Sequence, residues 1–316
     1  MPELLASTVF TNAFVTALVA GGLLAGVPLM FAGLGETISE RAGVLNIGLE
    51  GMMLMGAYAG FLGAFYGHSS WLGFGAGMVA GAFVALFMVV FCVRLGLDQI
   101  VIGIALTLSA EGITSVLQGA QFGTTYPRLD AAPTVSIPLL SKIPILGKSL
   151  FDQHLIVYLG FGLVPLVAWM LRSTNVGLNL RAVGEKPEAV DAAGVSVLAT
   201  RTWAVLVTGA LGGLGGAYIS IVGAGIFTPF LTNGNGFIAI VIAMLARGRP
   251  LWVVVGSFLF GMSLSLATAL QIARINISTD VVQMLPFVAV ILALIIFARR
   301  SYLPAALVLP YVRGAR

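Results

Sequence analysis

The sequence is poor in the residues on which metal sites, disulfides and hydrolytic centres depend. Its 316 residues include one cysteine, two histidines and only 9% charged side chains, against about 25% in an average globular domain. The single Cys92 excludes an intrachain disulfide, and His68 and His154 cannot form a metal site with it at useful spacing. We therefore expect no catalytic residue and no metal ligand in this chain.

A nucleotide-binding loop is also missing. The Gly147-Lys148-Ser149 sequence is the one candidate for a phosphate loop, but Lys142 stands where the first glycine of that motif belongs. We expect no cofactor on this chain, so any ATP and Mg²⁺ would have to be bound by a partner. The net charge of +4 is spread over the ends of apolar runs, which excludes a nucleic-acid-binding stripe.

Long apolar runs take the place of the missing polar residues. The chain is 59% hydrophobic, with a mean hydropathy of +1.05. About 20 apolar residues cross a bilayer as a helix, and the apolar content is too continuous for barrel strands. The sequence predicts an all-α integral membrane protein with a single transmembrane domain over 1–316. The runs without Lys, Arg, Asp or Glu are Leu4–Gly35, Gly51–Val93, Gln153–Leu171, Thr202–Ala246, Pro250–Ala273 and Val281–Ala298.

Breaks at glycine, proline and charged residues divide these runs into about nine helices, with a range of eight to ten. The expected helices cover 14–34, 47–66, 71–93, 99–118, 154–171, 202–223, 236–246, 251–270 and 281–298.

The lysines and arginines predict the orientation, because cytoplasmic loops are enriched in them. One arrangement puts twelve of these residues in the cytoplasm and four outside. It predicts an external N-terminus, a cytoplasmic C-terminus, an external loop at 119–153 and a cytoplasmic loop at 172–201. The external loop has two open interpretations, a passive cover or a docking surface for a binding protein. The twelve residues are Arg41, Arg94, Arg172, Arg181, Lys186, Arg201, Arg247, Arg249, Arg299, Arg300, Arg313 and Arg316.

An inverted internal repeat is predicted from two similar breaks. Residues 34–51 and 223–236 are both rich in Gly and contain Asn, and each is followed by three expected helices. The first break follows an inward helix and the second an outward one, so the halves are oppositely oriented. Many transporters build their solute path from such repeats.

Polar side chains inside the expected fourth helix are candidates for a solute path. Glu111 is costly in a bilayer unless it faces protein or water, at about 2.5–3.5 kcal/mol on insertion scales. Thr107, Glu111, Thr114 and Gln118 share one helical face. They are open to two interpretations, a cavity wall that binds a polar solute or a carboxyl satisfied by neighbouring helices.

The two breaks supply further candidates for the path. Asn46 and Glu50 lie one helical turn apart, and Asn233 and Asn235 alternate with glycines in the second break. Amide side chains offer both donors and acceptors to hydroxyl-rich or nucleobase ligands. Ordinary turn and cap chemistry is the alternative explanation for the same residues.

The expected cytoplasmic loop contains a short helix. Pro187 suits a first helical turn and Gly194 a C-terminal stop, which predicts a helix over 187–193. A helix of two turns is too short to be stable alone, so it either docks onto a partner or serves as a simple connector. The candidate docking residues are Glu185, Pro187, Glu188, Ala189, Ala192, Ala193 and Gly194.

These segments resemble a known family. The 187–194 segment is similar to the coupling element of ABC-importer permeases, and ISERAGVLNIGLEGMMLMGAYAG at 38–60 resembles the branched-chain amino acid/ribose-type permeases. Within that family the chain is most similar to the nucleoside and simple-sugar subgroup. The sequences NGNGF at 233–237 and RGRP at 247–250 support the resemblance, which covers essentially the whole chain.

The resemblance implies a multi-pass subunit of the bacterial cytoplasmic membrane, surrounded by lipid. Its implied partners are a second, related permease, a cytoplasmic ABC ATPase and an extracellular substrate-binding lipoprotein. The implied solute is a nucleoside or a simple sugar, with branched-chain amino acids as a third class. The residues alone leave two alternatives open, a secondary carrier or channel and a structural or signalling subunit.

Overall fold

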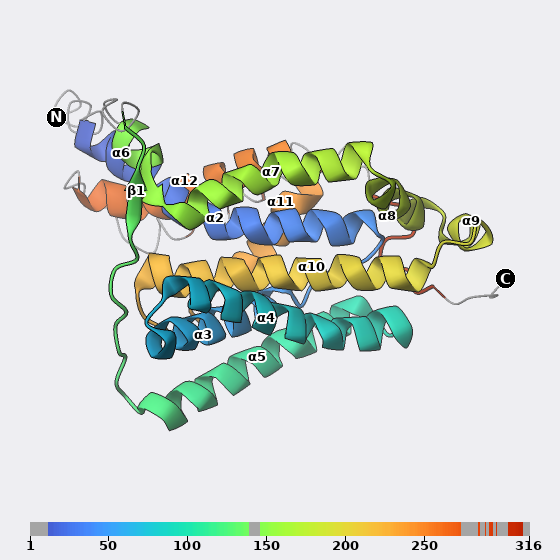
Figure 1. Ribbon diagram of the computed structural model, residues 1–316, viewed down its shortest axis with the longest axis horizontal. Helices are drawn as coiled ribbons and strands as arrows, with labels where there is room; N and C mark the ends of the chain where they lie inside the picture. Colours follow the sequence, from blue (N-terminus) through green and yellow to red (C-terminus); the bar gives the residue numbers. More distant parts are fainter. Residues whose placement is uncertain are drawn as a thin grey trace.

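The computed structural model describes residues 12–138, 146–272, 284, 288, 291–292, 295 and 303–311. Figure 1 shows a bundle in which most long helices follow one axis. Its elements in chain order are α2 (Asn12–Arg41), α3 (Leu49–Gly67), α4 (Ser70–Met88), η1 (Val89–Arg94), α5 (Gln99–Phe122), β1 (Thr134–Ser136), α6 (Leu146–Leu150), β2 (Asp152–His154), α7 (Leu155–Ser173), α8 (Asn175–Glu185), α9 (Pro187–Ala192), α10 (Val197–Tyr218), η3 (Ile219–Ala224), α11 (Asn235–Ala246) and α12 (Pro250–Ile272).

Helices α2 and α10 form the centre of the bundle. They pack against each other, α2 also packs against α11 and α12, and α10 also packs against α3 and α4. Helix α5 packs against α3 and α4 and crosses the bundle obliquely (Figure 1). Its outer side chains, such as Ile104, Leu108 and Val116, are exposed. Helices α8 and α9 lie at one end, called here the α9 end, and β1 and α6 lie at the other (Figure 1).

Eight of the nine expected helices coincide with observed helices. Five helical segments of the described chain are long and apolar enough to cross a membrane. The ninth expected helix, 281–298, lies outside the described residues apart from five single positions. The five segments are Phe14–Arg41, Ser70–Arg94, Gln99–Phe122, Leu155–Ser173 and Val197–Ala224.

The first helix is longer than the sequence predicts. The expectation ended it at residue 34, where the charge-free run stops, but α2 continues to Arg41. Glutamate and arginine are good helix formers, so charge alone does not end a helix. The extra turns bring Glu36 and Glu40 into the bundle, where both are buried.

Glycines let three helix backbones touch. A methyl group at Gly81 of α4 would overlap the carbonyl oxygen of Gly209 in α10, and one at Gly216 would overlap the carbonyl of Met53 in α3. A methyl at Gly56 would likewise overlap the Gly213 backbone. Such close approach is how helices associate in lipid, where apolar side chains gain little by pairing.

The two expected loops contain more regular structure than the sequence predicts. Helix α5 extends to Phe122, and β1 pairs antiparallel with β2, with Val135 opposite Gln153. At the α9 end, α8 occupies 175–185 and α10 begins at Val197 rather than at 202. Helix α8 was missed because its sequence, NVGLNLRAVGE, is too polar to stand out among apolar runs.

Candidate functional site

The two predicted breaks meet inside the bundle. Residues 42–48 join α2 to α3, and residues 225–234 join η3 to α11. Helix α11 has 12 residues, about 18 Å at 1.5 Å per residue. It ends at the turn 247–249, where Arg41 Nη2 donates to the carbonyl of Arg247 at 2.7 Å. The start of α11 therefore lies roughly half a bilayer thickness from that turn.

Glu50 joins the two breaks. Its Oε1 accepts hydrogen bonds from the Thr232 hydroxyl at 2.5 Å and from the Gly234 amide at 2.9 Å. Its Oε2 accepts from the Gly236 amide at 2.6 Å. The carboxylate is buried at the N-terminus of α11, where the free amides and the helix dipole favour a negative charge. Both of its oxygens are therefore engaged by the protein.

Asn46 lies one turn before Glu50 and is also buried. Its backbone amide donates to Glu36 Oε1 at 3.0 Å, and its side-chain amide donates to the sulfur of Met52 at 3.3 Å. Within the described chain, Asn46 Oδ1 is buried with no hydrogen-bond partner. The same holds for Glu36 Oε2, Ser39 Oγ and Glu40 Oε2.

The sequence analysis missed Glu36 and Glu40. They are one helical turn apart directly after an apolar run. That spacing is the signal that could have placed them on one face of a longer helix.

The polar face of α5 begins beside Glu50, since a methyl on Gly51 would lie 2.9 Å from the Thr107 Cα. Thr107 and Thr114 are buried, and their hydroxyls donate to the carbonyls of Gly103 and Ala110 in their own helix. Glu111 is half-buried. The structure thus brings Asn46, Glu50 and the α5 face together at the level where the two breaks meet.

Gln118 differs from its neighbours on this face. Its side chain is 2% exposed, and neither its oxygen nor its nitrogen has a hydrogen-bond partner within the described chain. An orphaned buried amide costs roughly 1–3 kcal/mol. One turn of helix further along, Gln121 accepts from Tyr58 at 2.8 Å and donates to Tyr66 at 2.8 Å. Gln121, which the sequence analysis missed, ties the end of α5 to α3.

The two asparagines at the second break are accessible, whereas Thr232 is buried. Asn233 is exposed and Asn235 is half-buried. Phe230 and Asn233 have φ values of 61° and 44°, a left-handed conformation that side chains rarely adopt. Strained residues of this kind tend to cluster at functional sites.

The predicted short helix is confirmed as α9, Pro187–Ala192, with Pro187 at its start. Gly194 follows with a φ of 85°, which suits a residue without a side chain. Val190 packs with Val183 and Val197 in a small core against Tyr311. The opposite side of α9 is exposed and consists of Glu188, Ala189, Ala192, Ala193 and Gly194, whereas Pro187 is buried and Glu185 is half-buried.

Arg201 holds the α9 end together. Its side chain is buried, and it donates to the carbonyls of Ala42 at 3.2 Å, Leu309 at 2.9 Å and Ala306 at 3.4 Å. These carbonyls belong to the first residue of the break that follows α2 and to the segment 303–311. The amide of Ala306 in turn donates to the carbonyl of Gly184 in α8 at 2.8 Å. The sequence analysis counted Arg201 only as a topology charge and missed this contact.

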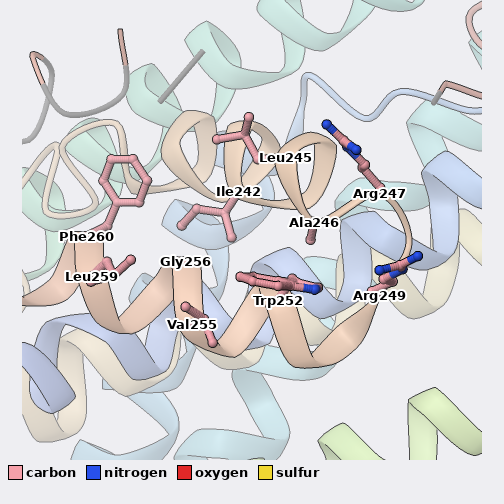
Figure 2. Close-up of a pocket in the computed structure, with 10 residues that line it drawn as sticks. All are labelled: Ile242, Leu245, Ala246, Arg247, Arg249, Trp252, Val255, Gly256, Leu259 and Phe260. Atoms are coloured by element: carbon pink, nitrogen blue, oxygen red, sulfur yellow. The ribbon is translucent and has the colours of Figure 1, made fainter. Parts of the chain in front are cut away.

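A separate groove of about 300 Å³ lies between α11 and α12 (Figure 2). Apart from two arginines at one end, its lining is apolar, so it offers little to a polar solute. The lining residues are Ile242, Leu245, Ala246, Arg247, Arg249, Trp252, Val255, Gly256, Leu259 and Phe260.

The sequence is similar to a known protein family over most of its length. A family model described as "branched-chain amino acid transport system / permease component" matches residues 18–296. The nucleoside ABC transporter permease protein NupC of Lactococcus lactis is 34% identical over 307 residues, which cover 94% of this chain and 97% of NupC. The guanosine ABC transporter permease protein NupQ of Bacillus subtilis is 34% identical over 310 residues, covering 95% and 97%.

A third relative is TsgC13 of Haloferax volcanii, which is provisionally named a glucose ABC transporter permease protein. It is 37% identical over 252 residues, covering 77% of this chain and 76% of TsgC13. In each of these three organisms, a second permease protein named for the same solute matches more weakly, at 24–27% identity.

Replacing Arg201 by glutamine should release the segment 303–311. The shorter side chain cannot reach three carbonyls, so buried acceptors lose their partners and stability falls by about 2 kcal/mol. Hydrogen exchange at the amides of Ala306 and Val308 measures the release. Arg181→Gln is the control, because Arg181 is exposed and donates within its own helix. Equal exchange in the two variants would contradict the role of Arg201.

Proposed function

Since the chain belongs to the family of branched-chain amino acid transport system permease components, as a permease subunit of an ABC importer and not an enzyme, we propose that its solute is a nucleoside or a simple sugar. The observation that carries the proposal is the similarity to two permease proteins named for nucleosides, which extends over nearly the whole of each chain. An ion-coupled carrier, which the residues alone left open, has no support from this family.

The polar residues inside the bundle favour an uncharged solute. A branched-chain amino acid carries a carboxylate, which needs a cation or a free helix N-terminus in a low-dielectric site. Residues 42–93 and 202–246 contain no lysine or arginine. The N-terminus of α11 is already occupied by Glu50. The amides of Asn46, Gln118, Asn233 and Asn235 instead match the donors and acceptors of a nucleobase or sugar hydroxyls.

The proposed path runs from the level of Glu50 along the polar face of α5. It includes Asn46, Glu50, Thr107 and Glu111, with Gln118 toward the β1 end, and Asn233 and Asn235 from the second break. Irregular backbone at membrane depth is tolerated only where it is buried in protein or lines a water-filled cavity. The exposure of Asn233 therefore supports a path or a partner surface at this point.

The proposed topology has nine helices in an inverted repeat, with an external N-terminus and a cytoplasmic C-terminus. It is supported by the meeting of the two breaks at one carboxylate and by the presence of Arg41, Arg201 and Arg247 at the α9 end. The whole chain would form one transmembrane domain in a bacterial cytoplasmic membrane.

An ABC permease works with an ATPase, and we propose three specific partners. The first is a second, related permease, supported by the pairs of permease proteins in three organisms. The others are a cytoplasmic ABC ATPase, which would hold the ATP and Mg²⁺, and an external substrate-binding lipoprotein. No cofactor is assigned to the permease itself.

Helix α9 is proposed to couple this permease to the ATPase. Its exposed side carries small residues, so a groove on the partner can approach the backbone closely. Val190 anchors its buried side, and α8, the segment 303–311 and Arg201 connect it to Ala42 in the first break. A displacement of α9 is therefore passed to the first break.

The solute class can be measured in proteoliposomes that contain both permeases, the ATPase and the binding protein. Uptake of labelled adenosine should require ATP and should be reduced at least about tenfold by excess guanosine, but not by leucine. Uptake of labelled glucose or ribose, without uptake of adenosine, would assign a sugar. Uptake of labelled leucine alone would contradict the proposed solute class.

Replacing Gln118 by methionine should separate solute binding from stability. Removal of an unpartnered buried amide leaves stability unchanged or higher by up to about 1 kcal/mol. If the amide binds solute, KM for uptake rises about tenfold, equivalent to about 1.4 kcal/mol. Gln121→Met is the matched control, with lower thermal stability and unchanged KM. An unchanged KM in Gln118→Met would remove that residue from the path.

A bulky residue on α9 should uncouple the ATPase. In Ala193→Trp the indole blocks the small-residue surface, so stimulation of ATP hydrolysis by loaded binding protein falls about tenfold. Ala199→Trp serves as the control, since Ala199 is exposed on the first turn of α10, outside that surface. Normal stimulation in Ala193→Trp would assign α9 the role of a simple connector.

A further inference from the structure

Glu50 acts on the path through the segment that it holds. We propose that Glu50 is a positioning residue for transport: its carboxylate fixes the segment 230–236, so that Asn235, together with Asn233, is held in place to meet the solute. The inference rests on the proposed path, because it assigns the role of one path residue to the placement of two others.

The segment does not hold its own conformation. Three of its seven residues, Phe230, Asn233 and Gly234, have positive φ values, and two of these are not glycine. Its internal backbone hydrogen bonds are single turns, from Asn233 to Phe230 and from Asn235 to Thr232. Strained backbone of this kind persists only when surrounding groups fix it. The surrounding group here is Glu50, which bonds Thr232, Gly234 and Gly236.

The packing around Glu50 makes this contact rigid. A methyl group on Gly236 would lie 2.5 Å from both the Cα and the amide nitrogen of Glu50, so the starts of α3 and α11 touch through a glycine. The hydroxyl of Thr232 is buried against the carboxylate. On the other side of the segment, Asn233 is exposed. The carboxylate therefore contacts the buried side of the segment and leaves the exposed Asn233 free.

The carboxylate of Glu50 is also largely committed to the protein. Oε1 accepts two hydrogen bonds and Oε2 accepts one, while an ionised carboxylate has about four lone-pair sites. Oε1 is therefore saturated, and Oε2 can accept at most one further hydrogen bond from a solute. The contacts of Glu50 with the segment outnumber any that it can offer to a solute, which favours a positioning role.

The test is a double-mutant cycle in the complete complex reconstituted in proteoliposomes, with adenosine uptake as the readout. Glu50→Gln replaces one acceptor oxygen by an NH₂ group, which cannot accept a hydrogen bond, so the amide of either Gly234 or Gly236 loses its acceptor. KM should rise about tenfold, and at least one of these two amides should exchange faster with solvent. Asn235→Ala should also raise KM, and the double variant should be no worse than the stronger single variant, because both changes remove the same contact.

Thr232→Val removes only the hydroxyl donor and should raise KM about threefold. If the complex with Glu50→Gln does not assemble, the KM of Thr232→Val tests the inference in its place. Glu40→Gln is the matched control, since Glu40 is a buried glutamate at the end of α2 that has no place in the proposed path, and its KM should be unchanged.

Effects of Glu50→Gln and Asn235→Ala that multiply to about a hundredfold would overturn the inference, because the two residues would then act independently. An unchanged KM in both Glu50→Gln and Thr232→Val, while Asn235→Ala still raises KM, would also overturn it and leave the proposed path intact. An unchanged KM in Asn235→Ala would instead contradict the path on which the inference rests.

Discussion

The first backbone amides of a helix have no acceptor within that helix. Where a helix begins inside a hydrocarbon layer, these amides must find acceptors elsewhere in the protein, since each unpaired N–H group costs several kcal/mol there. This constraint applies where α11 begins in the interior of the bundle. The carboxylate of Glu50 satisfies two of these amides and a hydroxyl from the same segment. The half-length helix, the irregular segment before it and the polar residues that the segment displays all depend on this contact between distant parts of the chain.

The same first break connects this contact to the α9 end. Arg201 donates to the carbonyl of Ala42, and the carbonyl of Gly43 accepts from the amide of Val308. Only six residues lie between Gly43 and Glu50. Coupling between sites can travel through rigid helices and hydrogen-bonded connections, and here one short stretch of chain joins the α9 end, which we propose to face the ATPase, to the carboxylate in the interior.

Much of this fold could be predicted from the sequence, because a bilayer imposes long apolar helices that composition reveals directly. The helix at Pro187 was predicted from a local rule that holds in any context. Contacts between distant residues could not be predicted in this way. Nothing near Glu50 in the sequence indicates that its acceptor oxygens serve Gly234 and Gly236, and Arg201 resembles any other interfacial arginine until its three carbonyl partners are known.

The glycine contacts among α3, α4 and α10 have a consequence for the membrane's electrical insulation. Where Gly81 lies against Gly209 and Gly56 against Gly213, backbone touches backbone with no side chain between. A file of water molecules cannot form in such a seam, so protons and small cations find no route through this part of the bundle. This seam therefore adds no ion leak of its own to a membrane in which the chain is embedded.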